Sequence, residues 1–259
     1  MTSLGLEHFD LSSRKAVVLG ADRPGGAAVA RAYAEAGAAI LLCVPEHNES
    51  VETLRRDVVA LGASCELIVG DMSAPERAGE AVRSAARAMG GLDILAICPD
   101  VFLAKPIEET SDAELNHVVA ANLSVPFAAI RAATVEMRGR AQGGRLLLLT
   151  HVLGERGLPN TSAYGASHAA TQNLVRTLGR ELGPDGITIN AIALGWMDWM
   201  SDRIDPDDEE AARAVRFAIL KRAGRPEASG PMAVGLSGSG TGYVTGQVFH
   251  LDGGLTQHL

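Results

Sequence analysis

The chain has few cysteines, no basic stripe and no apolar start, and each absence argues against a class of protein. Its three cysteines, Cys43, Cys65 and Cys98, are odd in number and lack metal-ligand spacing, so we expect buried free thiols without a disulfide framework or metal centre. The net charge of -8 without a basic stripe argues against nucleic acid or an anionic membrane as partner. Residues 1–10 have neither a basic start nor an apolar run, so we expect no signal peptide and a cytoplasmic protein.

Internal repeats, low-complexity tracts and linkers rich in proline or serine are also missing from the sequence. A chain of 259 residues with 47% hydrophobic content can bury one large core. We therefore predict a single domain over residues 1–259.

Short apolar runs alternate with helical stretches rich in alanine, arginine and glutamate. The apolar runs, which we expect to be strands buried on both faces, cover residues 16–19, 39–44, 65–69, 94–97, 146–149, 188–193 and 248–251. The predicted helices cover residues 27–36, 51–61, 74–89, 112–137 and 164–182. This alternation predicts an α/β fold: a doubly wound, Rossmann-type parallel sheet of about seven strands, with right-handed crossovers that place helices on both faces.

A series of short motifs follows the predicted strands in a characteristic order. They are found at residues 9–21, Asp71, residues 92–95, Asn122, Tyr164, residues 189–193 and residues 246–254. In this order and spacing the whole chain resembles the short-chain dehydrogenase/reductase family. The resemblance implies a nicotinamide-dependent oxidoreductase in which helix 164–182 carries the acid/base tyrosine.

Residues 19–26 match the turn that in this family reads Thr-Gly-x-x-x-Gly-x-Gly and holds the cofactor's pyrophosphate. Gly20 and Gly26 are retained, but Pro24 replaces the middle glycine. Proline adds a ring and removes a donor N–H where backbone approaches the phosphates, although Gly25 could shift to compensate. Gly20 and Gly26 also have an adequate explanation as turn and helix-packing glycines, so their presence does not require a cofactor.

Other cofactor positions are altered as well. The second strand ends in Val44 and Pro45 where the family places a group for the ribose, which leaves Glu46 as a candidate from the exposed loop. Asp71 stands where the family contacts adenine, yet an aspartate after a strand is equally typical of a turn or helix cap. The Asn-Asn-Ala-Gly motif after the fourth strand is replaced at residues 97–100, and Trp199 replaces the threonine that holds the carboxamide.

The catalytic positions keep two of four groups. Asn122 and Tyr164 match the family, whereas His168 stands where a lysine follows one helical turn after the tyrosine, and His151 replaces the serine that polarises the substrate. Neutral imidazole lowers the pKa of a phenol, ordinarily about 10, far less than an ammonium does. The two histidines either form an unusual acid/base set or fill space in a disused site.

Residues 202–210 are strongly acidic and fall where the family places its substrate lid; we expect a solvated helix start there.

Three hypotheses follow from this pattern. The first is an inactive subunit that binds no cofactor and associates, in a heterotetramer, with an active NAD-dependent paralogue that oxidises a 3-hydroxyacyl-CoA-type substrate. The resemblance implies that helices 112–137 and 164–182 form the interface. The second is an active NAD(P)-dependent oxidoreductase that uses Tyr164 with His151 and His168. The third is a non-redox lyase or ligand-binding module.

Overall fold

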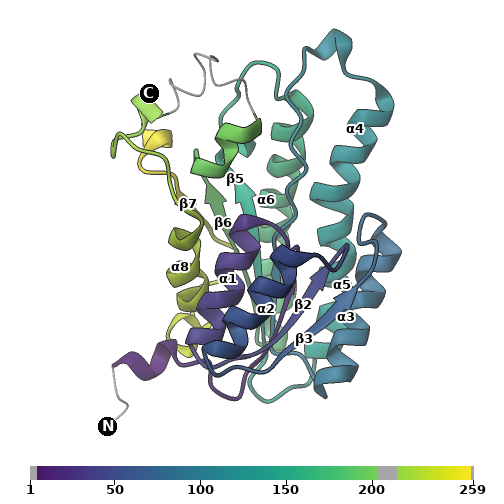
Figure 1. Cartoon of the computed structure of the whole chain (residues 1–259), viewed down its shortest axis with the longest axis vertical. Coiled ribbons are helices and arrows are strands. Elements are labelled where there is room, and N and C mark those ends of the chain that lie inside the picture. Colours follow the sequence, from purple (N-terminus) through teal and green to yellow (C-terminus); the bar gives the residue numbers. More distant parts are fainter. Residues whose placement is uncertain (1–4, 204–214, 258–259) are drawn as a thin grey trace.

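The computed structural model describes residues 5–203 and 215–257 and arranges them around one parallel sheet (Figure 1). Its seven strands are β1 (Lys15–Leu19), β2 (Ala39–Val44), β3 (Cys65–Val69), β4 (Ile94–Ile97), β5 (Gly144–His151), β6 (Ile187–Leu194) and β7 (Val248–Leu251). They are ordered β3-β2-β1-β4-β5-β6-β7, and every neighbouring pair is parallel. The predicted doubly wound fold is confirmed.

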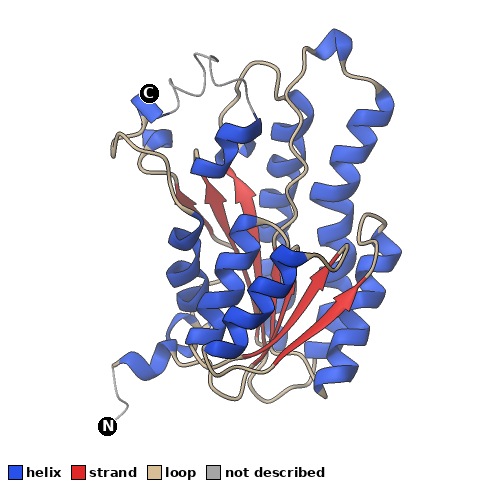
Figure 2. Ribbon diagram, in the orientation of Figure 1, coloured by secondary structure: helices blue, strands red, loops and turns tan. Residues whose placement is uncertain are grey.

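Helices cover both faces of the sheet (Figure 2). On one face lie α1 (Pro24–Glu35), α2 (Glu49–Ala60) and α8 (Ser229–Ser237), and on the other lie α3 (Pro75–Met89), α5 (Val125–Met137) and α6 (Ser162–Leu182). Successive strand residues serve opposite faces: Ala16 and Val18 pack with the first group, while Val17 and Leu19 pack with the second. The central strands therefore carry apolar side chains on both faces.

The prediction that all seven strands are buried on both faces is wrong for β3 and β7. Along β3, Glu66 and Val69 are exposed, and all four residues of β7 are only half-buried. The sheet order places these two strands at its edges, where fewer helices cover them. The central strands β5 and β6 are longer than predicted, with eight residues each, all buried.

The long helix predicted over residues 112–137 is interrupted. It comprises α4 (Asp112–Val119), a π-helical turn (Ala120–Ser124) and α5, which begins at Val125. Pro126 has no N–H to donate to the carbonyl four residues earlier, that of Asn122, and the hydroxyl of Thr171 donates to that carbonyl instead, at 2.8 Å. The cross-helix bond fixes Asn122 against α6.

Residues 112–137 are long and apolar enough to span a membrane by length and composition, with a mean hydropathy of 1.5. However, 61% of this stretch's most apolar window is buried inside the fold. Ala129, Ala133 and Met137 pack into the core formed with α3 and the sheet. Core packing accounts for the apolar character of this helix.

The order of the sheet reverses direction between β1 and β4. Both strands point their carboxyl ends to the same edge, and in doubly wound sheets the ligand cleft forms outside that edge at such a reversal. The loops after β1, β4, β5 and β6 all begin at this edge of the sheet. They carry most of the residues that the sequence singles out.

Candidate active site

The turn between β1 and α1 keeps its glycines for reasons of packing. Gly20 has a φ of +82°, and a Cβ atom on it would lie 2.6 Å from the carbonyl oxygen of Cys98. A Cβ atom on Gly26 would overlap the carbonyl oxygen of Gly20. Pro24 is the first residue of α1, a position whose N–H has no partner within the helix. Leu149 lies over Gly25, where an added Cβ would be 2.9 Å from its Cδ1 atom.

The side chains expected to contact the adenosine half of a cofactor form hydrogen bonds with nearby residues of the chain. Asp71 accepts a hydrogen bond from the backbone N–H of Ser73 at 2.8 Å and one from Arg77 at 3.1 Å. The hydrogen bonds from Ser73 lower the pKa of Asp71. Glu46, the exposed loop candidate, accepts from the amide of Asn48, which caps α2. Asp71 thus makes the contacts that its interpretation as a turn residue predicts, while its contact with adenine stays a prediction.

Tyr164 and His168 lie on one face of α6, as their spacing predicts. Their ring centroids are 4.4 Å apart, and both side chains are buried. His168 Nδ1 shares a hydrogen bond of 3.0 Å with the hydroxyl of Thr150. Burial, with a smaller contribution from nearby His151, lowers the pKa of His168 to about 3. The imidazole is therefore neutral at physiological pH and supplies no positive charge beside the phenol of Tyr164.

His151, at the end of β5, belongs to the same group of rings. Its centroid lies 5.5 Å from that of Tyr164 and 6.2 Å from that of His168. The Nδ1 atom of His151 accepts a hydrogen bond from the backbone N–H of Leu153 at 3.1 Å, so the neutral ring carries its proton on Nε2. The fold thus brings together Tyr164, His151 and His168, as the sequence predicts.

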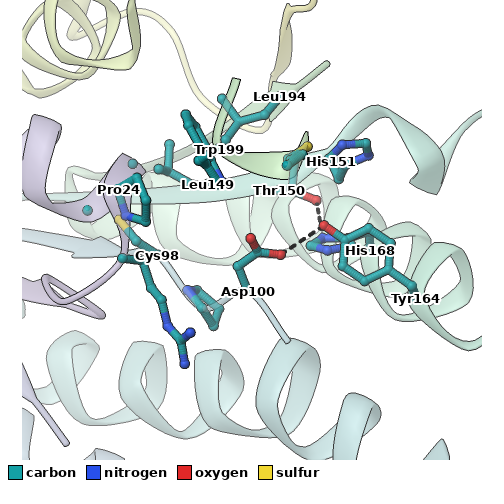
Figure 3. A pocket seen from close by; sticks show the side chains of 15 residues that line it. Pro24, Cys98, Asp100, Leu149, Thr150, His151, Tyr164, His168, Leu194 and Trp199 are labelled. Atoms are coloured by element: carbon teal, nitrogen blue, oxygen red, sulfur yellow. Dashed lines mark hydrogen bonds between the residues drawn. The ribbon is translucent and has the colours of Figure 1, made fainter. Parts of the chain in front are cut away.

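The residue that sequence reasoning missed is Asp100. The hydroxyl of Tyr164 donates a hydrogen bond of 2.9 Å to Asp100 Oδ1, across 64 positions of sequence (Figure 3). Asp100 follows β4 at the last position of the family's Asn-Asn-Ala-Gly motif, where a glycine is expected. A carboxylate in place of a glycine beside the catalytic tyrosine was the signal that could have identified it.

Asn122 is retained, but its polar atoms are directed at structural partners. Its side chain accepts from the N–H of Val101 and donates to the carbonyl of Val101, both at 3.0 Å. The same amide donates to Ser167 at 3.3 Å, and the backbone carbonyl of Asn122 accepts from Thr171. Asn122 therefore ties the loop after β4 to α6.

The cavity beside Tyr164 is small. Its volume is about 20 Å³, roughly enough for one water molecule. Three apolar side chains, those of Leu149, Leu194 and Trp199, line the cavity on the side away from Tyr164 (Figure 3). In this conformation the volume beside Tyr164 is smaller than that of a nicotinamide ring. The acidic segment 202–210, expected as a solvated helix start near this site, lies almost wholly outside the described residues.

A larger cleft of about 210 Å³ adjoins the cavity. Its polar lining includes Asp22, Asp71, Asp100, Arg23 and His117, and its apolar lining comes from the ends of β1, β2 and β4. Arg23 and Asp22 form an ion pair at 3.3 Å. The cleft therefore presents more carboxylates than cations to a bound molecule.

The three cysteines are free thiols, as predicted, but only Cys43 and Cys98 are buried, whereas Cys65 at the start of the edge strand β3 is half-buried. No group of three metal-ligating side chains is found in the part of the chain that the structure describes. Burial raises the pKa of Cys43 to about 12 and that of Cys65 to about 11, and it also raises the pKa of Cys98. We expect Ellman's reagent to react slowly with the native protein at pH 8. After unfolding, we expect it to react rapidly with all three thiols. Rapid reaction of Cys98, which lines both cavities, would contradict this burial.

Comparison with known proteins agrees with the fold. Residues 20–256 match the family model described as enoyl-(acyl carrier protein) reductase, and the chain belongs to the short-chain dehydrogenase/reductase family. It is 30% identical to nodulation protein G of Rhizobium sp. (strain N33), over 95% of this chain and 98% of that protein. It is 28% identical to gluconate 5-dehydrogenase of Gluconobacter oxydans (strain 621H), over 97% of this chain and 98% of the relative.

A solved structure is also similar. A dehydrogenase/reductase from Sinorhizobium meliloti 1021 superposes with a TM-score of 0.89 at 31% identity, covering 96% of this chain and 98% of that one. The relatives named here as dehydrogenases or reductases are oxidoreductases. The fold is thus shared along its whole length.

Proposed function

We propose that this chain is the non-catalytic subunit of a heteromeric short-chain dehydrogenase, which carries no nicotinamide itself and supports an active, NAD-binding paralogue. The observation that supports this most is the cavity of about 20 Å³ beside Tyr164, where the family would bind the nicotinamide. In addition, the phenol of Tyr164 donates to a carboxylate and its neighbour His168 is neutral. A phenol so placed lacks the positive neighbour that proton transfer at neutral pH requires.

For the paralogue we propose a 3-hydroxyacyl-CoA-type substrate. The pattern of altered motifs is similar to that of the inactive subunit of the hydroxyacyl-CoA dehydrogenase in anaerobic toluene degradation through benzylsuccinate. The substrate of the complex would then be 2-[hydroxy(phenyl)methyl]succinyl-CoA. Free thiols are compatible with the cytoplasmic location that this function implies.

The proposed partner surface lies on α5 and α6. On α5, Phe127, Arg131 and Val135 are exposed and recur every fourth residue, so they form one stripe. Phe127 is 46% exposed and Val135 68% exposed, so both present apolar surface along this stripe. A partner helix packed on this stripe would bury them, as in a four-helix bundle between the subunits of a tetramer.

Two other functions are alternatives. An active NAD(P)-dependent oxidoreductase would use Tyr164 with His151 and His168, and the names of the relatives favour oxidoreductase chemistry. A non-redox lyase or ligand-binding module would instead use the cleft of about 210 Å³. Each alternative predicts a different number of bound nucleotides and of subunit types in the purified complex.

Native mass spectrometry of the complex purified from its source cells, with NAD present, tests the proposal. We expect a mixed oligomer in which bound nucleotide is counted only for the partner subunits. A homo-oligomer with one nucleotide per chain would overturn the proposal in favour of the active enzyme. A homo-oligomer without nucleotide would overturn it in favour of the non-redox module.

A further inference from the structure

We propose that the side chain of Asp100 closes the nicotinamide end of the cleft. The chain then lacks several of the family's cofactor-binding groups and, in addition, excludes a dinucleotide by means of this carboxylate. This inference rests on the proposed function, because it supplies the physical means by which the subunit stays without a cofactor. It assigns a role to a residue that lies outside every family motif retained in the sequence.

The position of Asp100 is the first argument. Asp100, together with Arg23, Cys98 and Pro99, lines both the cavity of about 20 Å³ and the cleft of about 210 Å³, so it lies where the two adjoin. Its Oδ1 atom lies 2.9 Å from the hydroxyl of Tyr164 (Figure 3). Tyr164 is only 1% exposed, and its hydrogen bond points at Asp100. A ring that entered from the cleft would have to displace the carboxylate and break this bond.

The backbone that carries Asp100 is held from both sides. Pro99 precedes it and restricts the chain, and Val101 follows it. Asn122 binds both the N–H and the carbonyl of Val101 at 3.0 Å. Asn122 is itself tied to α6 through Ser167 and Thr171. The retained asparagine thus positions the loop that presents the carboxylate to Tyr164.

Charge supports the same conclusion. The pyrophosphate of a dinucleotide carries two negative charges. Two of the cleft's carboxylates, Asp22 and Asp71, form ion pairs with Arg23 at 3.3 Å and Arg77 at 3.1 Å. The carboxylate of Asp100 at the inner end adds repulsion. The hydrogen bond from the Tyr164 hydroxyl to Asp100 also occupies the proton that an acid/base tyrosine has to transfer. Asp100 therefore opposes both binding and chemistry.

The test compares NADH binding by full-length variants, each expressed without a partner so that no other subunit contributes nucleotide. Trp199 is a second side chain that fills the small cavity, so the comparison is made in the Trp199→Thr background. Isothermal titration calorimetry is run on wild type, Trp199→Thr, Trp199→Thr with Asp100→Ala, and Trp199→Thr with Asp100→Asn. Thermal unfolding of each variant at one protein concentration establishes that it is folded.

We expect no saturable binding by wild type or Trp199→Thr, and saturable binding to appear once Asp100→Ala is added. The asparagine variant is the matched control: it keeps the volume and an acceptor for Tyr164, so we expect it to stay closed. Equal binding by folded Trp199→Thr with and without Asp100→Ala would overturn the inference and leave the proposed function intact. Equal opening by the asparagine and alanine variants would overturn closure by the placed side chain. Binding of one NADH per wild-type chain would overturn the proposed function itself.

Discussion

Replacement of Gly26 by alanine is expected to lower the free energy of unfolding by about 3 kcal/mol or more. Gly26 lies inside α1, where alanine is intrinsically favoured over glycine by roughly 0.5 to 1 kcal/mol. The tertiary contact reverses that preference, because the new Cβ atom would overlap the carbonyl oxygen of Gly20. Backbone on both sides of this contact cannot move without separating α1 from β1. The expected sign is therefore opposite to the one that helix propensity gives.

Gly25→Ala is the matched control for this prediction. The added Cβ atom would lie 2.9 Å from the Cδ1 atom of Leu149 and 4.0 Å from that of Leu194. The Leu149 side chain borders the small cavity, into which it can shift. We expect the stability of this variant to stay within about 1 kcal/mol of wild type. Urea denaturation at a fixed protein concentration measures both variants. Wild-type stability for Gly26→Ala would show that packing does not explain this glycine and would return it to a role in cofactor binding.

The stability of the protein is expected to fall by about 2 kcal/mol between pH 7 and pH 5 because of His168 alone. The pKa of His168 is lowered to about 3 in the fold, whereas in the unfolded chain it is near 6.5. Between these values the unfolded chain takes up a proton that the folded chain does not. The stabilising contribution is therefore complete above about pH 6.5 and is lost as the pH falls toward 3.

His168→Gln isolates this effect. Its stability at pH 7 will differ from wild type for reasons of packing, so the quantity compared is the change between pH 7 and pH 5. We expect that change to shrink by about 2 kcal/mol in His168→Gln and to match wild type in His117→Gln, whose side chain is exposed. The same pH dependence in His168→Gln and wild type would mean that His168 is not held neutral. In that case His168 would be able to supply the positive charge beside Tyr164 that the family's lysine supplies.

Much of the fold could be predicted because the signals are local. Apolar runs such as residues 94–97 are strands because both faces of a central strand need apolar side chains, and β4 has the predicted bounds. The edge strand β3 has the predicted bounds but the wrong burial, because its neighbours in the sheet are decided by topology. The π-helical turn before α5 was also missed, since it depends on Pro126 together with a hydroxyl from Thr171 on another helix.

By itself the sequence determined the sheet, the helices and the pairing of Tyr164 with His168 on one helical face, because a spacing of four residues has the same meaning in any helix. Only the tertiary structure decided what that pair can do. The meeting of Tyr164 with Asp100 joins residues 64 positions apart, and the neutral state of His168 results from burial by several elements. Periodicity is a property of neighbouring residues, whereas charge and access at a site depend on contacts between distant ones.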